Sequence, residues 1–352
     1  MYMQNDSVAI LGHFGEKRNL LNGQTIKTSN LVEGLTKYGN LEVCKIDSHG
    51  WTKHPWLLLK QIRVAFMTCD AIIMLPAQNG VRVFAPLLIY YKKKYGKKVF
   101  YDVIGGWLPA FLRSKHYLQN VLKSFDGIWT ETATMKSELD QMGFKNTTVI
   151  PNFKELRPLK TDELVYPAGT PFRLCTFSRV MKEKGIESAA RAVKNVNERL
   201  GFIAYSLDIY GQIEAGSEDW FESIRKEFPH YVLYKGCVAA DKSVEVLKDY
   251  FALLFPTHFF TEGIPGTIID AYSAGVPVIS ARWESFSDVV EEGRTGIGYE
   301  FDNMRELENV LLSVTYNPQK LLGMKKSCLE QINHYVPETV IKEIIKIINT
   351  PY

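Results

Sequence analysis

Short apolar runs alternate with longer stretches in which apolar residues recur every three or four positions, along nearly the whole chain. The short runs predict buried strands, and the periodic stretches predict amphipathic helices. Strands and helices in alternation are typical of parallel, doubly wound sheets with helices on both faces. In the first half we expect strands at Val8–Leu11, Leu41–Ile46, Ala71–Leu75, Lys98–Tyr101, Gly127–Thr130 and Thr147–Ile150.

The second half repeats this pattern, which predicts an α/β protein with two Rossmann-like parallel-sheet domains. Helical periodicity in the first half is clear at Thr25–Tyr38, Arg82–Tyr95 and Thr134–Met142. In the second half the expected strands are Leu174–Phe177, Ser206–Tyr210, Val232–Lys235, Ala252–Phe255, Val278–Ser280 and Ile297–Glu300.

The segment Pro151–Pro171 is rich in Pro, Lys and Glu and poor in periodic apolar positions, so we interpret it as the linker. The expected domains are residues 1–165 and 166–335. The tail Pro337–Asn349 has an amphipathic pattern, and we expect the helix at 336–352 to pack back on the first domain. Two such domains are expected to face a central cleft at the carboxyl ends of their strands, where ligands bind in this class.

Composition limits the class of protein. The chain has 352 residues, 46% of them hydrophobic and 23% charged, as in ordinary globular proteins. No apolar run approaches the roughly 18 residues that cross a bilayer, and the polar start of the chain does not resemble a signal peptide. The five cysteines lack metal-ligand spacing and are expected to be reduced thiols, which favours a cytoplasmic protein.

The net charge of +3 hides an asymmetry. Residues 1–165 hold 22 Lys/Arg and 14 Asp/Glu, whereas residues 166–352 hold 20 and 25. The basic first half favours an anionic partner, and we expect peripheral contact with the inner face of the cell membrane. The densest cluster, Lys92–Lys98, is equally well explained as a solvated helix end that the helix dipole favours.

The stretch Thr261–Ile279 carries the clearest candidate chemistry. It predicts a short helix at Gly266–Ala274 between two buried strands, with Pro265 at its start. The amides of its first residues, Gly266, Thr267 and Ile268, would form an anion site suited to phosphate. Carboxylates at Glu262 and Asp270 flank this site, which suggests a ligand with phosphate and hydroxyl groups: a nucleotide sugar.

Two cations open the second half. Arg179 follows the strand Leu174–Phe177, and Lys184 precedes the next helix. The helix dipole disfavours a cation at that position unless an anion binds there. Together the two side chains would neutralise a diphosphate.

A glycine turn also follows the first strand, at Gly12–Gly15, and a second one at Asn22–Gly23 precedes the first helix. Such turns admit a phosphate or a sugar close to the backbone, so Gly15 is a candidate donor contact and Asn22 a candidate acceptor contact. The third glycine of the dinucleotide fingerprint and its distal acid are absent, which disfavours NAD.

Several segments together resemble the retaining GT-B glycosyltransferases of family 4, also called glycosyl transferases group 1. Glu262–Pro265 and Asp270–Ile279 resemble the paired-acid donor motif of that family, and Ser178–Ile186 resembles its diphosphate-binding pair. Val149–Asn152 and Leu207–Gly211 resemble the end of its first domain and a strand of its second.

The resemblance implies a role for each matching residue. Glu262 would hold the donor sugar and Asp270 the ribose, while Arg179 and Lys184 would stabilise the leaving nucleoside diphosphate. The nucleotide, UDP- or GDP-linked, would place its base against Gly236, Cys237 and Val238. Such enzymes retain anomeric configuration and need no metal or cofactor, because the cations and the helix dipole offset the charge.

The chain departs from the family pattern at two places. Asp270 stands where a Glu is usual, and its reach is one methylene shorter. The usual first-domain histidine is missing from Asp102–Trp107. Backbone at Gly105 and Gly106 and a stacking Trp107 are therefore expected on the acceptor side, whereas His13 and His116 are interpreted as structural or exposed.

These observations predict a hexosyltransferase that moves a sugar from a nucleotide donor to a saccharide, in particular a lipid-linked saccharide, in surface polysaccharide biosynthesis. No nucleic acid partner is expected. Two alternatives stay open: a nucleotide-sugar epimerase on the same scaffold, and a degenerate homologue that binds a sugar or a partner without turnover.

Overall fold

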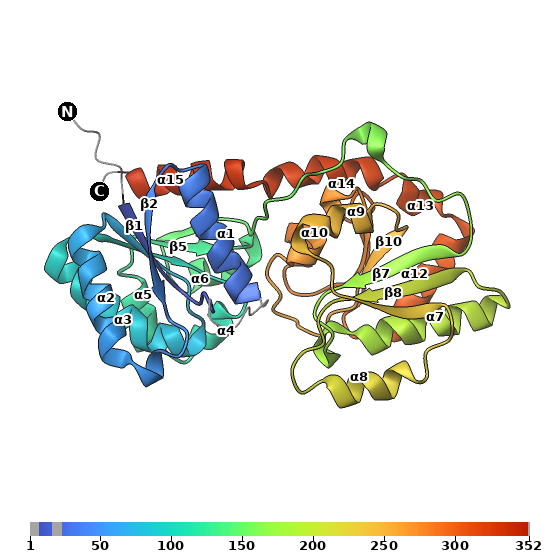
Figure 1. Cartoon of the computed structure of the whole chain (residues 1–352), viewed down its shortest axis with the longest axis horizontal. Coiled ribbons are helices and arrows are strands. Elements are labelled where there is room, and N and C mark those ends of the chain that lie inside the picture. The colour runs from blue at the N-terminus through green and yellow to red at the C-terminus, as the bar shows by residue number, and fades with distance from the viewer. Residues whose placement is uncertain (1–6, 16–22, 351–352) are drawn as a thin grey trace. The chain divides into compact units, whose positions relative to one another are not determined.

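Figure 1 shows a computed structural model of the chain, which describes residues 7–15 and 23–350. Within these residues the strands form two six-stranded sheets, and all pairs of neighbouring strands are parallel. The predicted α/β class with two Rossmann-like parallel-sheet domains is confirmed, and every strand lies within two residues of its expected span.

The chain divides into two units, residues 1–155 with 334–352, and residues 156–333. The division falls inside the predicted linker and before the boundary expected after residue 165. Between Asn152 and Pro171 the chain forms one short 3-10 turn, at η2 (Thr161–Glu163), and no strand.

The sheet of the first unit has the strand order β2-β1-β3-β4-β5-β6. Side chains alternate along each strand, so Val8 and Ile10 face one side and Ala9 and Leu11 the other. Its strands are β1 (Ser7–Gly12), β2 (Glu42–Asp47), β3 (Ala71–Met74), β4 (Lys98–Asp102), β5 (Gly127–Thr130) and β6 (Thr147–Val149).

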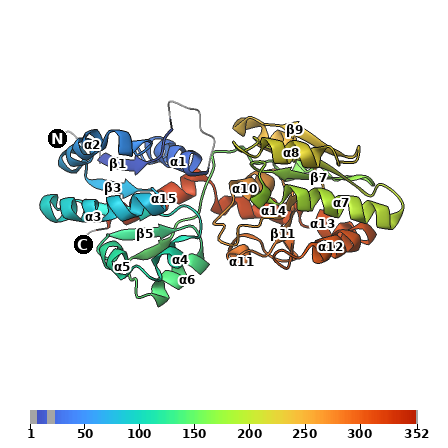
Figure 2. The ribbon, with the colours of Figure 1, turned by 90° about the horizontal axis from the view of Figure 1, so that it is seen from below.

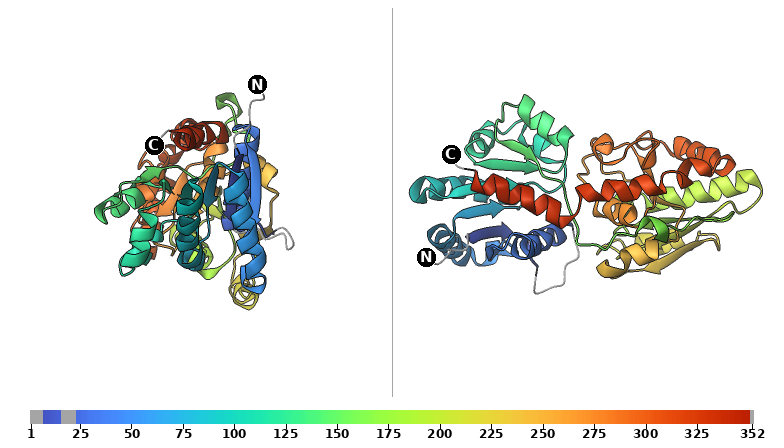
Figure 3. Two further views of the ribbon diagram at one scale, coloured as in Figure 1. Left: turned by 90° about the vertical axis from the view of Figure 1, so that its left-hand side faces the viewer. Right: turned by 90° about the horizontal axis from the view of Figure 1, so that it is seen from above.

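Helices cover both faces of this sheet. One face carries α2 (Pro55–Thr68), α3 (Gln78–Tyr95), α4 (Leu108–Leu112), α5 (His116–Leu122) and α6 (Ala133–Gln141). The other carries α1 (Gly23–Lys37) and α15 (Pro337–Asn349). Figure 2 views the unit from the side of α2 and α3, and the right-hand view of Figure 3 shows α15 on the opposite side.

The last helix belongs to the first unit because its apolar stripe completes that core. Val340, Ile341, Ile344 and Ile348 of α15 are buried against α1 and the sheet. Gly34 of α1 allows the close approach, since a Cβ there would lie 2.8 Å from Cδ1 of Ile341.

The sheet of the second unit has the order β12-β11-β10-β7-β8-β9. Its strands are β7 (Phe172–Phe177), β8 (Tyr205–Tyr210), β9 (Val232–Gly236), β10 (Ala252–Phe255), β11 (Val278–Ala281) and β12 (Gly296–Tyr299). The helices of this unit are α7 (Ile186–Leu200), α8 (Glu218–Arg225), α9 (Ser243–Leu247), α10 (Gly266–Ser273), α11 (Phe286–Val289), α12 (Met304–Tyr316), α13 (Gln319–Leu322) and α14 (Lys325–Gln331).

Both sheets reverse their direction of winding at their first strand. In the second sheet the chain proceeds from β7 to β8 and β9 on one side and places β10, β11 and β12 on the other. The switch point therefore lies between β7 and β10, and in open α/β sheets ligands bind at the carboxyl edge of this place. The corresponding place in the first sheet is between β1 and β3.

Candidate functional site

Arg179 follows β7, and the backbone on either side of it is held by hydrogen bonds to the end of the neighbouring strand β8. The N–H groups of Ser178 and Val180 donate to the carbonyls of Tyr210 and Gln212, at 3.1 and 2.8 Å. Gly211 has φ +137°, and a Cβ there would lie 1.8 Å from the carbonyl oxygen of Ser178, so the approach requires glycine.

The Arg179 guanidinium lies at this edge and is partly exposed. Its Nη1 donates to Oε2 of Glu214 at 2.7 Å, and each side chain keeps about a third of its surface in solvent. The cation is therefore held by a neighbouring carboxylate that a bound diphosphate would have to compete with.

Lys184 is the last residue of the short turn η3 (Lys182–Lys184). This turn packs against the loop that follows β10. The next residue, Gly185, has φ +69°, and a Cβ there would lie 1.8 Å from the carbonyl oxygen of Pro256. In addition, the His258 N–H donates to the carbonyl of Glu183 at 2.8 Å. The loops after β7 and β10 are thus joined where they meet.

Lys184 and Glu262 form an ion pair at this junction, and both side chains are largely buried. The same carboxylate oxygen of Glu262 accepts a bond from the Thr257 hydroxyl at 3.1 Å. The Lys184 ammonium also lies 5.0 Å from the ring centre of Phe259 and 5.7 Å from that of Phe255. Two of the predicted catalytic residues therefore touch each other.

The predicted anion cradle is the start of α10, where Pro265 is the N-cap in extended conformation. The Ile268 N–H donates to the Pro265 carbonyl at 2.9 Å, so this amide is used within the first turn. The Thr267 hydroxyl is buried, and no described residue pairs with it. A buried hydroxyl without a partner is costly unless a ligand supplies one.

Asp270 lies one turn into α10 and is 2% exposed. Its Oδ1 accepts a bond at 2.8 Å from the hydroxyl of Ser243, the first residue of α9. The Asp270 carboxylate, which is predicted to bind the ribose, thus also holds the start of α9 in place.

The predicted base-binding loop follows β9 at the same edge of the sheet. Gly236 has φ +76°, and its carbonyl accepts a bond from the Gly211 N–H at 2.9 Å. Cys237 is exposed, and Val238 is half-buried. The loop is therefore anchored beside the segment that positions Arg179.

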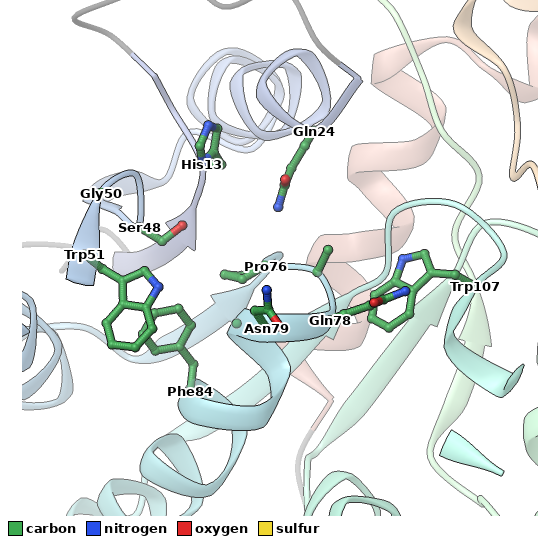
Figure 4. Close-up of a pocket in the computed structure, with 12 residues that line it drawn as sticks. His13, Gln24, Ser48, Gly50, Trp51, Pro76, Gln78, Asn79, Phe84 and Trp107 are labelled. Carbon is green, nitrogen blue, oxygen red and sulfur yellow. The ribbon is translucent and has the colours of Figure 1, made fainter. Parts of the chain in front are cut away.

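The first unit contains a cavity of about 420 Å³ at its own switch point, shown in Figure 4. Loops after β1, β2 and β3 and the starts of α1 and α3 form it. The lining residues are His13, Gln24, Ser48, Gly50, Trp51, Pro76, Ala77, Gln78, Asn79, Gly80, Phe84 and Trp107.

Among the acceptor-side predictions, Trp107 lines this cavity, and its indole N–H donates to the Ile104 carbonyl at 2.8 Å. Gly105 and Gly106 are its immediate neighbours in the loop, and Gly105 has φ +73°. Gly15 follows β1 and is buried, with φ +60°. The prediction for Asn22 falls outside the described residues.

His13 was interpreted as structural, yet it lines the cavity. Its Nε2 lies 3.2 Å from Nδ1 of His49. Burial, and then the nearby His49, lower the pKa of His13, while Asp47 opposes them. The residue is therefore neutral near pH 7, and its imidazole serves as a hydrogen-bonding group. The exposed His116 begins α5 and lies elsewhere.

A buried ionic cluster supports the loop that carries Trp107. The Lys27 ammonium lies 2.7 Å from Asp102, 2.9 Å from Glu131 and 2.7 Å from the Val103 carbonyl oxygen. Burial raises the pKa of the Asp102 carboxyl, against the opposing effect of Lys27. The cluster ties α1 to the ends of β4 and β5.

Sequence reasoning missed this cluster and most of the cavity lining. The available signal was positional: Gln78 and Asn79 follow the buried strand β3, beside β1, where parallel sheets place their ligands. Within residues 7–15 and 23–350, no group of three or more His, Cys, Asp and Glu side chains is arranged to hold a metal ion. No helix in this part of the chain is long and apolar enough to cross a membrane.

The second unit matches a known sequence family. Residues 171–316 match the family described as glycosyl transferases group 1. No curated protein matches the chain.

Solved structures of similar fold include TarM from S. aureus, in complex with Fondaparinux, alpha-GlcNAc-glycerol and UDP. It is 17% identical, with a TM-score of 0.65, over 83% of this chain and 59% of that one. The chain thus spans about three fifths of the length of TarM.

Two other solved structures match this chain over almost the whole length of both proteins. Anabaena Alr3699/HepE, in complex with UDP and glucose, is 14% identical with a TM-score of 0.72, over 97% of this chain and 99% of that one. The lipopolysaccharide outer core galactosyltransferase WaaB, in its apo form, is 15% identical with a TM-score of 0.68, over the same shares. These likenesses establish the GT-B fold.

Proposed function

We propose that this protein is a retaining, metal-independent hexosyltransferase that moves a sugar from a UDP- or GDP-linked donor to a saccharide acceptor. The observation that carries the proposal is the contact of Lys184 with Glu262 at the switch point of the second sheet. The match to glycosyl transferases group 1 and the UDP-bound structures of similar fold support it.

The second unit would hold the donor. Arg179, Lys184 and the start of α10 provide positive charge at one sheet edge, which suits a diphosphate. Thr267 offers a buried hydroxyl, for which no partner is found among the described residues, to a phosphate oxygen. Asp270 would reach the ribose hydroxyls, and Gly236, Cys237 and Val238 would lie against the base.

The chemistry follows from a diphosphate leaving group. The bond from the anomeric carbon to the diphosphate oxygen breaks, the acceptor hydroxyl oxygen bonds to that carbon, and the hydroxyl proton passes to the departing diphosphate oxygen. Negative charge grows on the diphosphate, where Arg179 and Lys184 offset it, while Glu262 stabilises the positive charge that develops on the sugar. Lys184 contacts Glu262 already, so it would orient this carboxylate before the donor binds.

The first unit would hold the acceptor in its cavity. Trp51, Phe84 and Trp107 supply aromatic surface, and Gln24, Gln78 and Asn79 supply amide groups. Among the described residues that line the cavity, no side chain is Lys, Arg, Asp or Glu. Aromatic faces with uncharged hydrogen-bonding groups suit a neutral sugar, so the phosphate of a lipid-linked acceptor would lie outside this cavity.

A lipid-linked acceptor places the reaction in surface polysaccharide biosynthesis, on the cytoplasmic side of the membrane. The basic first half of the chain supports this part of the proposal. Its alternatives are a nucleotide-sugar epimerase, or a homologue that binds a sugar or a partner without turnover.

The test is incubation with a panel of nucleotide sugars and candidate saccharides, with nucleoside diphosphate release and product configuration as readouts. We expect release with one donor and retention in the product. Glu262→Gln should abolish release, and Glu198→Gln, an exposed carboxylate on α7, should leave it unchanged. Donor binding without release would favour the non-catalytic homologue. An isomerised donor with its nucleotide still attached would favour the epimerase.

A further inference from the structure

The positive charge of the first unit comes from one part of the chain. Residues 51–100 contain nine Lys and Arg and a single acid, Asp70, whereas in residues 1–50 and in 101–165 the two signs balance. Asp70 is itself paired with Lys97 at 3.3 Å. The charge asymmetry of the protein is therefore local.

The structure gathers this charge on one face. The four consecutive helices α2, α3, α4 and α5 contain no Asp or Glu, and all four pack on the same side of the first sheet. The other helices of this unit carry acids: α6, on the same side, has Glu138 and Asp140, and on the opposite side α1 has Glu33 and α15 has Glu338 and Glu343. We call the outer surface of α2, α3 and α5 the carboxylate-free face (Figure 2).

Large apolar side chains protrude from the same face. Trp56 is 82% exposed at the start of α2, next to the exposed Leu57. Val64 and Met67 follow at helical spacing, so apolar residues and cations make up most of the exposed side of α2, together with the polar Gln61 and Thr68. The exposed residues Val83 and Tyr90 of α3 and Tyr117 of α5 extend this surface.

Cations lie between these apolar residues. Lys60 and Arg63 of α2 and Lys93 and Lys94 of α3 are exposed. An apolar side with Trp and Leu among Lys and Arg is typical of helices that lie in the headgroup region of a membrane. Protein interfaces are instead depleted in Lys, and a nucleic acid would not require exposed Leu, Val and Met.

We propose that the carboxylate-free face docks this protein on an anionic lipid surface, with Trp56 and Leu57 inserted among the headgroups and the flanking lysines on lipid phosphates. The biological role of this docking rests on the proposed function, because docking would bring the enzyme to an acceptor that is held in the membrane.

The docking surface begins close in sequence to the lining of the cavity in the first unit. Trp51, in the turn η1 (Trp51–Lys53), lines the cavity and packs edge-on against Phe84 at 5.4 Å. Trp56 stands at the surface five residues later. A saccharide whose lipid lies in the membrane would thus approach the cavity beside α2.

Vesicle sedimentation tests the proposal. The full chain is mixed with vesicles of phosphatidylcholine alone, or with vesicles to which the anionic lipid phosphatidylglycerol is added. We expect binding to the anionic vesicles only, weakened by salt because surface charges are screened. Lys60→Gln with Lys93→Gln should weaken binding about thirtyfold, at about 1 kcal/mol per cation. Trp56→Ser with Leu57→Ser should weaken it about tenfold or more.

Two control variants show whether the loss of binding is specific to the carboxylate-free face. Lys342→Gln with Lys346→Gln removes two cations from α15 on the opposite side of the sheet, and Tyr316→Ser removes an aromatic side chain that is 79% exposed on α12. Both should bind vesicles like the wild type. Equal loss in the controls, or no binding to anionic vesicles, would overturn the proposal.

Two other outcomes would also overturn it. One is a dimer in solution that Trp56→Ser with Leu57→Ser dissociates, which would assign the face to a second copy. The other is binding to a DNA duplex that needs the lysines but not Trp56. Turnover of a soluble saccharide without vesicles should be unaffected by all these variants, so failure of docking and failure of the proposed transfer are separately visible.

Discussion

Lys184 and Glu262 are 78 residues apart in sequence, and their side chains are bonded to each other where the loops after β7 and β10 meet. A cation suited to the donor diphosphate and a carboxylate suited to the donor sugar therefore neutralise one another before any ligand binds. Because Gly185 packs on the backbone of Pro256, this arrangement is built into the fold of the second unit.

Arg179 is predicted to be restrained by Glu214. Glu214→Gln weakens that partly exposed ion pair and frees the guanidinium, so the affinity for nucleoside diphosphate should rise about threefold. Arg179→Gln should lower it roughly tenfold or more, because a charge-assisted bond to phosphate is lost. Isothermal titration with UDP and GDP measures both variants. Changes of the same sign would contradict the competition between Glu214 and the ligand.

The Thr267 hydroxyl is predicted to bind a donor phosphate. Thr267→Val should raise the donor KM about fivefold to tenfold through the loss of one hydrogen bond. Thr176→Val is the matched control, since the Thr176 hydroxyl in β7 is also buried without a partner among the described residues. Both changes should leave the protein at least as stable in thermal unfolding, and only Thr267→Val should alter KM. A KM unaltered by Thr267→Val would remove this residue from the site.

Asp270 is predicted to serve both the ribose and Ser243. Asp270→Asn keeps an oxygen that accepts from Ser243, so stability should change little, while the neutral amide should weaken nucleoside diphosphate binding roughly tenfold. Ser243→Ala removes the bond and should cost about 1 kcal/mol in the free energy of unfolding, with a smaller effect on binding. Urea unfolding and titration of each variant separate the two roles. If Asp270→Asn binds normally, Asp270 is structural.

Lys325 predicts a pH dependence of stability. This side chain of α14 is fully buried, and burial lowers its pKa from 10.5 to about 8. The unfolded chain then binds more protons between these values, so the free energy of unfolding rises with pH across this window, and the penalty of burying the charge is fully present below pH 8. Lys325→Met should stabilise the protein at pH 7 by on the order of 2 kcal/mol.

Urea unfolding at pH 7 and pH 10.5 measures this effect. The difference between Lys325→Met and wild type should shrink at the higher pH, where Lys325 is neutral in the folded protein and only half protonated in the unfolded chain. A difference independent of pH would show that packing, not charge, explains it.

The sequence was sufficient for the strands, because buried strands are contiguous apolar runs. It also indicated that Arg179, Lys184, Glu262 and Asp270 follow the strands β7 and β10, and their role as a donor site stays a prediction. It could not predict which charges would pair. The contacts of Lys184 with Glu262, of Arg179 with Glu214 and of Asp270 with Ser243 depend on loops that meet only in three dimensions.

The cavity and the buried ionic cluster of the first unit were harder to predict from the sequence, for a similar reason. Its cavity is assembled from His13, Gln24, Trp51 and Asn79, which are scattered residues without spacing of their own. The buried cluster of Lys27, Asp102 and Glu131 joins three elements, and its residues look like ordinary surface charges in sequence. Exposure of Trp56 on α2 was likewise invisible, since an apolar helix residue is more often buried.

The most direct test of the central claim is nucleoside diphosphate binding by Lys184→Met and by Lys182→Met, two variants in the same turn η3. Lys182 is exposed, whereas Lys184 is bonded to Glu262. Isothermal titration with UDP and GDP should show one nucleotide bound by the wild type and by Lys182→Met, with a loss of roughly thirtyfold or more in Lys184→Met. Equal affinity in both variants would contradict the assignment of this pair to a donor diphosphate site.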